Sequence, residues 1–304
     1  MKKRKSSKKN ILLPISIIFS AIIISGSVIY IAQLKYGNKA AITSLEEEKK
    51  DMENLQGKVI PKEGVTLPVK WGDLGSQLTT TGTIDSQKFE SLYTKRGGLN
   101  EEEKAFLYGK DYGNIKITPQ NSQFLLNMFW AVGIGNKNAI LEKGPMTDPQ
   151  YGGAQGFAST GGWTIGKGNP MDHYSKHKMI TLTEDQQKRV EEVSRNIYRP
   201  CCNNSTYFPD CNHGMAMLGL LELMASQGLS EEKMYENALI VNSYWFPDTY
   251  LTIGKYMKMK KSLDWEDVNP KEVLGINFSS RTGYSQIVSE ITPAASSGGG
   301  GCSV

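Results

Sequence analysis

The residues best suited to chemistry are three cysteines and a histidine that lie close together in the chain. Cys201, Cys202, Cys211 and His213 all occur in the stretch RPCCNNSTYFPDCNHG. A disulfide between the adjacent Cys201 and Cys202 would close a strained ring, whereas two adjacent thiolates can readily act as ligands of a soft metal. Thiolates beside a neutral imidazole suit zinc or copper. The pattern therefore predicts a soft-metal site formed by these four residues.

The position of Cys211 leaves a second interpretation open. Cys211 and His213 mark the start of an apolar helix that we predict over residues 213–227. A thiol at a helix N-terminus has a lowered pKa, which makes it either nucleophilic or avid for metal. If the protein is an enzyme, we expect a thiol–disulfide oxidoreductase that uses Cys201, Cys202 and Cys211.

A third interpretation is purely structural. In an oxidising compartment Cys211 can pair with Cys201 or Cys202 and simply staple the loop. The fourth cysteine, Cys302, lies in the segment GGGGCSV. An unpaired cysteine outside the cell usually has a use or a partner, so Cys302 is a weaker candidate ligand that could also hand on a metal or a disulfide.

Other potential ligands are weaker. His173 and His177 are four residues apart in DHYSKH, a spacing that puts both imidazoles on one face if the stretch is helical. Four methionines follow the cysteines, and thioethers can bind Cu(I). Their spacing among leucines is also typical of core positions; they are Met215, Met217, Met224 and Met234.

Two classes of ligand are not expected. The stretch GGWTIGKG matches G-x-x-x-x-G-K, but Gly168 stands where a nucleotide-binding P-loop has Ser or Thr, and no apolar strand precedes it. The net charge is +4, and the first ten residues alone carry +6, which leaves −2 for residues 11–304. A nearly neutral body lacks the basic surface of a nucleic-acid-binding protein. We therefore expect neither a nucleotide cofactor nor a nucleic-acid partner.

The cysteine region resembles a known family. The order Arg199-Pro200-Cys201-Cys202, a short loop, an apolar helix and QGLSEEKMYENAL is similar to the CcmH/CycL thiol proteins of cytochrome c maturation. In that family a C-x-x-C pair precedes a helix, and G-x-S-x-x-E opens the next one. The segment, residues 197–246, also resembles extracytoplasmic PCYCGC-motif lipoproteins. The resemblance implies a small helical unit that handles thiols or metals, and a metal or thiol partner protein.

The N-terminus predicts the location of the protein. Residues 11–34 contain no charged side chain, and a run of this length is enough to cross a bilayer as a helix. The basic residues 1–10 should remain cytoplasmic. We therefore expect a single-pass protein of the cell membrane with residues 37–304 outside the cytoplasm. A cleaved signal peptide ending near Ser25-Gly26-Ser27 is the alternative.

The elements that must position the cysteines are predicted to be mainly α-helical. With 39% hydrophobic and 22% charged residues, the chain is typical of a globular protein. Asn100-Glu101-Glu102-Glu103 and Thr183-Glu184-Asp185-Gln186 have the form of capping boxes, and Ser230 should cap a further helix. The segments that follow the transmembrane helix are a stalk and linker (35–65), a helical part (66–150), a part with a glycine-rich loop and the cysteines (151–290), and a disordered tail (291–304).

Overall fold

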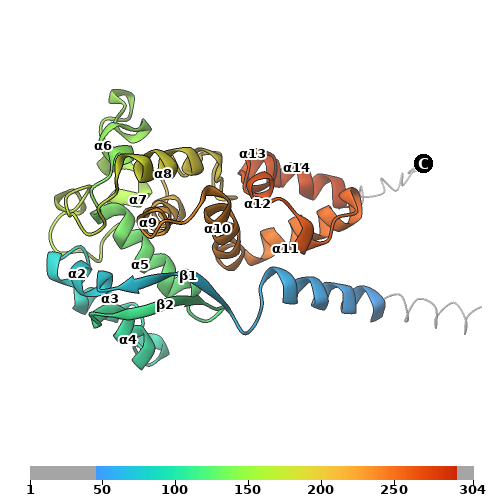
Figure 1. The fold of residues 1–304 in the computed structure, drawn as a ribbon, viewed down its shortest axis with the longest axis horizontal. Coiled ribbons are helices and arrows are strands. Elements are labelled where there is room, and N and C mark those ends of the chain that lie inside the picture. Colours follow the sequence, from blue (N-terminus) through green and yellow to red (C-terminus); the bar gives the residue numbers. More distant parts are fainter. Residues whose placement is uncertain (1–45, 293–304) are drawn as a thin grey trace, which may run out of the picture. The chain divides into compact units, whose positions relative to one another are not determined.

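The computed structural model describes residues 46–292 (Figure 1). The predicted basic segment, transmembrane helix 11–34 and almost all of the predicted tail, including Cys302, lie outside the described residues. Between residues 46 and 292, none of the helices combines the length and the apolar character that a membrane span requires.

Helices dominate the described part of the chain, as the sequence predicts. A helix runs over residues 46–59. Among the later helices, the longer ones are α2 (Leu74–Thr81), α4 (Glu101–Tyr108), α5 (Ser122–Gly135), α8 (Glu184–Asn196), α9 (Asn212–Ser226), α10 (Glu231–Trp245), α11 (Pro247–Tyr256) and α14 (Arg281–Ile291). The shorter ones are α3 (Ser86–Ser91), α6 (Ala139–Lys143), α7 (Ala158–Gly161), α12 (Pro270–Val273) and α13 (Ile276–Ser279).

Two compact units divide the chain at residue 54. Residues 46–54 are the described part of the first unit, and all of their side chains are exposed. The second unit begins at Leu55. Val59 and Ile60, which fall within the predicted stalk and linker, are buried in its core.

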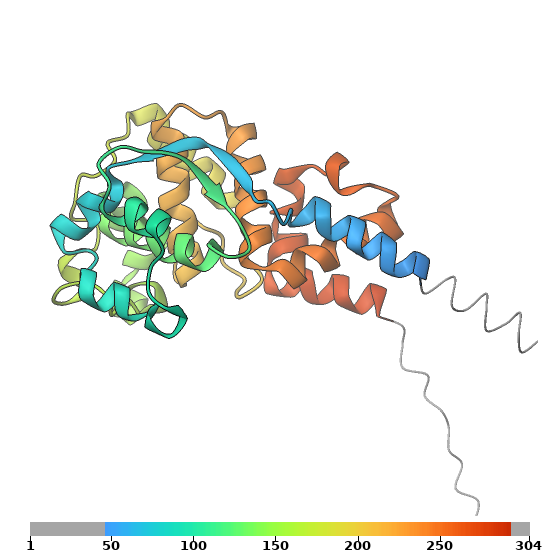
Figure 2. The ribbon, with the colours of Figure 1, turned by 90° about the horizontal axis from the view of Figure 1, so that it is seen from below.

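Residues 66–150 are mostly helical, as predicted, and they also contain a small sheet that was not predicted. Strands β1 (Val65–Gly72) and β2 (Tyr112–Ile117) pair in an antiparallel sheet that lies along one side of the helices (Figures 1 and 2). Alternate residues Leu67, Val69 and Trp71 are buried. The ring of Trp71 stacks on Phe106 at 4.3 Å, which joins the sheet to the core.

Helices α5 and α9 form the centre of the core. Most of their side chains are buried, and glycines let their backbones approach closely. A Cβ atom at Gly133 would lie 2.0 Å from the carbonyl oxygen of Met215, and one at Gly219 would lie 2.4 Å from that of Phe129. Since α5 belongs to the predicted segment 66–150 and α9 to the segment 151–290, the two segments share one core.

The predicted helix starts are confirmed. Asn100 caps α4 and Thr183 caps α8, each with a complete capping box. The hydroxyl of Ser230 accepts a hydrogen bond from the backbone N–H of Lys233 at the start of α10. The glycine-rich region consists of turns and short helices anchored by the buried Trp163, whose indole N–H donates to the carbonyl of Thr83 at 2.8 Å.

Candidate functional site

The loop between α8 and α9 carries the cysteines. It is fastened to the end of α8, because the backbone N–H of Thr206 donates to the carbonyl of Ile197 at 2.8 Å and that of Tyr207 donates to Ser194 at 3.1 Å. Thr206 is completely buried and its hydroxyl also donates to Ile197. These hydrogen bonds hold the loop against the end of α8.

The structure brings together the three cysteines that the sequence singles out. Ligand atoms of Cys201, Cys202 and Cys211 all lie within 4.8 Å of one another. The sulfur atoms of Cys201 and Cys211 are 3.5 Å apart. All three side chains are partly exposed and none is in a disulfide. We call these three residues the cysteine cluster.

A buried arginine contacts the cysteine cluster and the loop that carries it. Arg199 is only 1% exposed, and its Nε donates to the sulfur of Cys211 at 2.9 Å. The two terminal nitrogens donate to the carbonyls of Asn204 and Phe208, both at 3.0 Å, and one of them also pairs with the carboxylate of Asp210 at 2.7 Å. Every edge of the guanidinium is thus used to set the shape of the cysteine loop.

Two details explain how an arginine fits in this place. Gly214 lies in the first turn of α9, and a Cβ atom there would lie 2.4 Å from the Arg199 guanidinium. The carboxylate of Asp210 also accepts a hydrogen bond from the side-chain amide of Asn204 at 2.9 Å. The sequence signals of this buried arginine are Gly214 and Asp210, which lie near the two cysteine positions of a short loop. The sequence analysis did not recognise them.

The three thiols differ in acidity. Cys211 is the N-cap residue of α9, as predicted. Thiol hydrogen bonds from Cys201 and Cys202, together with the charge of Arg199, lower the pKa of Cys211. Hydrogen bonds with Cys202 and Cys211, together with burial, raise the pKa of Cys201. Cys211 is therefore the most acidic thiol of the cluster.

His213 does not join the cysteine cluster. Among the described residues, the group of donor atoms within 4.8 Å consists of the three cysteines without this histidine. The imidazole packs instead on Phe246, with ring centroids 4.3 Å apart, and near Trp245 at 6.0 Å. Burial lowers the pKa of His213, which keeps it neutral.

The second histidine pair is close but is engaged in hydrogen bonds. His173 lies in a turn and His177 forms an isolated β-bridge with Asn136, so the two residues are not on one helix. Nδ1 of His173 is 3.0 Å from Nε2 of His177, and Nε2 of His173 is 2.7 Å from the carbonyl oxygen of Lys167. Because a carbonyl oxygen only accepts, Nε2 of His173 is the donor in its hydrogen bond to Lys167. Both ring nitrogens of His173 are thus occupied.

The remaining predicted ligands are elsewhere. Cys302 lies outside the described residues. The four methionines considered as Cu(I) ligands are buried among the apolar side chains of the core, as expected for packing residues; they are Met215, Met217, Met224 and Met234.

One buried charged residue was missed by the sequence analysis. Glu222 lies inside the apolar helix α9 and is completely buried. Its two carboxylate oxygens accept from the side-chain amides of Asn136 at 3.1 Å and Asn138 at 2.5 Å. Burial raises its pKa well above the usual value despite these bonds. The sequence signal that could have identified Glu222 is a single acidic residue within the apolar stretch GLLELMA.

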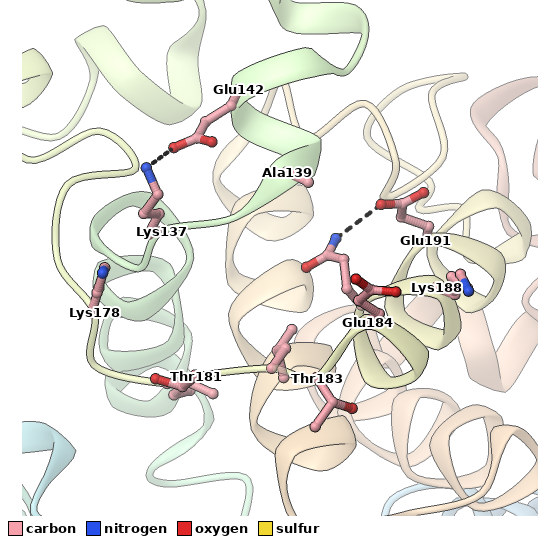
Figure 3. A pocket seen from close by; sticks show the side chains of 12 residues that line it. Lys137, Ala139, Glu142, Lys178, Thr181, Thr183, Glu184, Lys188 and Glu191 are labelled. Carbon is pink, nitrogen blue, oxygen red and sulfur yellow. Dashed lines mark hydrogen bonds and ion pairs between the residues drawn. The ribbon is translucent and has the colours of Figure 1, made fainter.

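A cavity of about 680 Å³ lies next to the chain on either side of Asn138, because Lys137 and Ala139 line it. Residues from 137–142, from 178–184 and from α8 line it (Figure 3). Lys137 and Glu142 form an ion pair of 2.8 Å on one side, and Gln187 donates to Glu191 at 3.1 Å on another. No cysteine lines this cavity, so it is separate from the cysteine cluster.

Comparison with known proteins adds no identity. No family model matches the chain, and neither the curated proteins nor the solved structures contain one with significant similarity. Three sulfurs that converge beside a buried guanidinium form a set of donors that fits a soft metal ion.

Proposed function

We propose that the protein binds a soft metal ion, zinc or copper, through the sulfurs of Cys201, Cys202 and Cys211. The single observation that supports this proposal most strongly is that the ligand atoms of these residues converge to within 4.8 Å of one another. Sulfurs bound to one zinc ion each lie about 2.3 Å from it, so the sulfur atoms must also lie within a few ångströms of one another. Little movement of the loop is needed to place an ion between them.

The electrostatics of the site support the same function. Three thiolates and a divalent cation together carry a net charge of −1, and burying an unpaired charge is costly. The guanidinium of Arg199, which already donates to Cys211, supplies a positive charge beside the sulfurs. Asp210 is paired with the same guanidinium, so this positive charge offsets the excess negative charge of the metal-bound site only in part.

We further propose that this site works outside the cytoplasm, on a protein held in the cell membrane by residues 11–34. The supporting observations are the uncharged run in the sequence and the basic residues before it. A protein partner that delivers or receives the ion, or exchanges thiols, is part of the proposal.

Metal titration of the purified full-length protein in detergent, reduced and kept anaerobic, tests the function. We expect one Zn²⁺ or Cu(I) per chain. Cys202→Ser and Cys211→Ser should each weaken binding by more than about 100-fold, since the loss of a ligand exceeds the loss of an outer-shell contact. Ser205→Ala, in the same loop, is the matched control and should bind as the wild type. Equal uptake by the wild type and a Cys202→Ser/Cys211→Ser variant would refute metal binding at the cluster.

One observation favours a second function, that of a thiol–disulfide oxidoreductase. The sulfur of Cys211 lies 3.5 Å from the sulfur of Cys201, and the pKa of Cys211 is lowered. In such a reaction Cys211 attacks a disulfide of a partner protein and releases one partner thiolate. Cys201, on losing its proton, then attacks the sulfur of Cys211 and releases the second thiolate. The partner is reduced and a Cys201–Cys211 disulfide forms.

The same purified protein distinguishes this alternative. A disulfide that works in exchange has a reduction potential above about −300 mV, whereas structural disulfides lie below it. A high potential combined with no metal uptake supports the oxidoreductase. A low potential combined with no metal uptake supports a structural disulfide.

A further inference from the structure

A short turn that follows α11 projects into solvent. Residues Met257–Lys261 form one turn of π-helix, a rare conformation that is frequent at functional sites. Met257 is buried, and its carbonyl accepts a hydrogen bond from the backbone N–H of Leu263 at 3.2 Å. Residues 258–263 are all exposed. The turn is therefore a projection that is anchored at its base.

The exposed side chains of this turn are of two kinds. Met259 is 56% exposed and Leu263 is 39% exposed, which is unusual for large apolar side chains. Four lysines lie next to them within a stretch of seven residues; they are Lys255, Lys258, Lys260 and Lys261. We call residues 255–263 the basic turn.

The acidic residues that follow the basic turn are engaged in ion pairs. Asp264 pairs with Lys258 at 2.6 Å, and Glu266 pairs with Lys58 at 2.8 Å. The ion pairs of residues 46–292 include no partner for the other three lysines of the turn. These three ammonium groups are thus available to an anionic partner.

The basic turn lies near the point where the chain enters the second compact unit. That unit begins at Leu55, and a Cβ atom at Gly254 in α11 would lie 3.0 Å from the Leu55 side chain. Twenty residues, 35–54, separate Leu55 from the proposed membrane-spanning run 11–34. A chain of this length reaches at most about 66–72 Å. The unit is therefore close enough to the proposed membrane for its surface to touch the lipid.

The composition of the basic turn fits an anionic lipid surface. Apolar side chains flanked by lysines bind where headgroups meet acyl chains, and the long lysine side chains reach the lipid phosphates. Each lysine near an anionic membrane surface strengthens binding about 5-fold. A tether to the same membrane adds an effective concentration in the millimolar range, so that a weak contact is sufficient.

On these grounds we propose that the basic turn binds the headgroups of anionic phospholipids in the membrane that holds the protein. The lysines contact the phosphates, and Met259 and Leu263 enter the boundary of the acyl chains. This inference goes beyond metal binding and rests on the proposed membrane location alone.

Helix α14 separates the lipid contact from the cysteine cluster. At its start, the backbone N–H of Arg281 donates to the carbonyl of Cys202 at 3.0 Å. Near its end is Glu290, and burial together with a hydrogen bond to Glu290 raises the pKa of Tyr256 in the basic turn. Nine helical steps from Arg281 to Glu290 correspond to about 14 Å. A membrane contact at the basic turn should therefore leave the cysteine cluster accessible.

The test uses full-length protein in nanodiscs of phosphatidylcholine alone or of phosphatidylcholine and phosphatidylglycerol in equal parts. Hydrogen exchange of backbone amides, measured by mass spectrometry, reports which segments the lipid covers. The basic turn should exchange at least about 5-fold more slowly in the anionic discs, whereas residues 199–211 should exchange equally in both. About 1 M NaCl should remove the difference, because the Debye length falls to about 3 Å.

Substitution of two lysines tests whether the turn itself makes the contact. Lys260→Gln/Lys261→Gln should lose most of the protection, since each lysine contributes about 5-fold. The matched control is Lys176→Gln/Lys178→Gln, which removes the same charge from two exposed residues elsewhere on the unit. This control should keep the full protection.

The outcomes separate this inference from the location on which it rests. Equal exchange of the basic turn in the two kinds of disc, or full protection in Lys260→Gln/Lys261→Gln, would overturn the lipid contact. Protection by added polyglutamate but not by phosphatidylglycerol would also overturn it, because the turn would then recognise an acidic protein. Failure of the protein to enter the discs would overturn the membrane anchor, and exchange measured with added vesicles of the two compositions then decides whether the turn binds lipid.

Discussion

At the residue scale, the cysteine cluster depends on a side chain that is itself no metal ligand. Arg199 donates to Cys211 and pairs with Asp210. Its planar group makes these contacts in several directions at once, which a lysine cannot do. We therefore regard Arg199 as the residue that both shapes the loop and stabilises the thiolate.

Replacement of Arg199 by Gln should raise the pKa of Cys211, because the positive charge beside the thiolate is lost. The rate of alkylation of Cys211 as a function of pH, measured in a Cys201→Ser/Cys202→Ser/Cys302→Ser background and compared with that background alone, reports this pKa. The substitution should also lower the free energy of unfolding by about 3–5 kcal/mol, since it removes the charged partner of Asp210 and Cys211.

The control for this prediction is Arg195→Gln. Arg195 is an exposed residue of α8 whose guanidinium lies over the ring of Tyr207 at 3.5 Å. It should leave the alkylation profile of Cys211 unchanged. An unchanged profile in Arg199→Gln as well would mean that the thiol contacts alone, without the arginine, set the acidity of Cys211.

Residue types predicted the cysteine cluster but not its surroundings. Cys201, Cys202 and Cys211 could be found from spacing, because soft ligands are rare and were grouped. The burial of Arg199 was not predicted, because arginine is almost always exposed. Its burial depends on the space above Gly214, which is a property of the packed helix.

At the element scale, the contact between α5 and α9 depends on glycines. A Cβ atom at Gly219 would lie 2.4 Å from the carbonyl oxygen of Phe129 and 2.7 Å from the backbone nitrogen of Gly133. These are backbone atoms, so they can move away only if one helix shifts as a whole. Gly219→Ala should therefore lower the free energy of unfolding by about 1–3 kcal/mol through overpacking, as measured by chemical denaturation.

The matched control is Gly57→Ala in the helix 46–59. Gly57 has no neighbouring atom within 4 Å of an added Cβ. Alanine should stabilise this helix by about 0.5–1 kcal/mol, because it restricts the unfolded chain more than glycine does. The two alanine substitutions are thus expected to change the free energy of unfolding in opposite directions. A stabilising effect at Gly219 would show that the two helices separate at little cost.

The helices could be predicted where a capping residue marks their first turn. Asn100 and Thr183 begin helices through capping boxes, which can be predicted because the residues involved are only three positions apart in the sequence. Strand β1 was not predicted, although alternate residues in it are buried. It contains Pro68, which cannot donate to a sheet, and its register shifts between Thr66 and Lys70. Its partner β2 pairs with it across a separation of 40 to 52 residues, and local patterns carry no information about such a pairing.

At the scale of the whole molecule, the elements on either side of the glycine-rich region act as one body. Helix α5 precedes that region and α9 follows it, and they share the core on which the cysteine loop is built. The loop is in turn held by α14 near the C-terminal end of the described chain. The cysteine cluster therefore needs the intact unit from Leu55 onward, and we do not expect residues 197–246 to form it alone.

The proposed location is a prediction about the same whole molecule. Residues 11–34 are uncharged and long enough for a bilayer, and an added protease should reach the chain only on the outer side. Fractionation should place the intact protein in the membrane. Mild proteolysis of intact cells should then release a fragment that starts between residue 35 and the compact unit at Leu55 and that retains the cysteine cluster. A protein without residues 11–34 and with its domain intact should be found in the soluble fraction. Recovery from wild-type cells of a soluble mature form that begins near residue 28 would show that the segment is a cleaved signal peptide, because an uncleaved span cannot leave the bilayer without exposing its apolar residues to water.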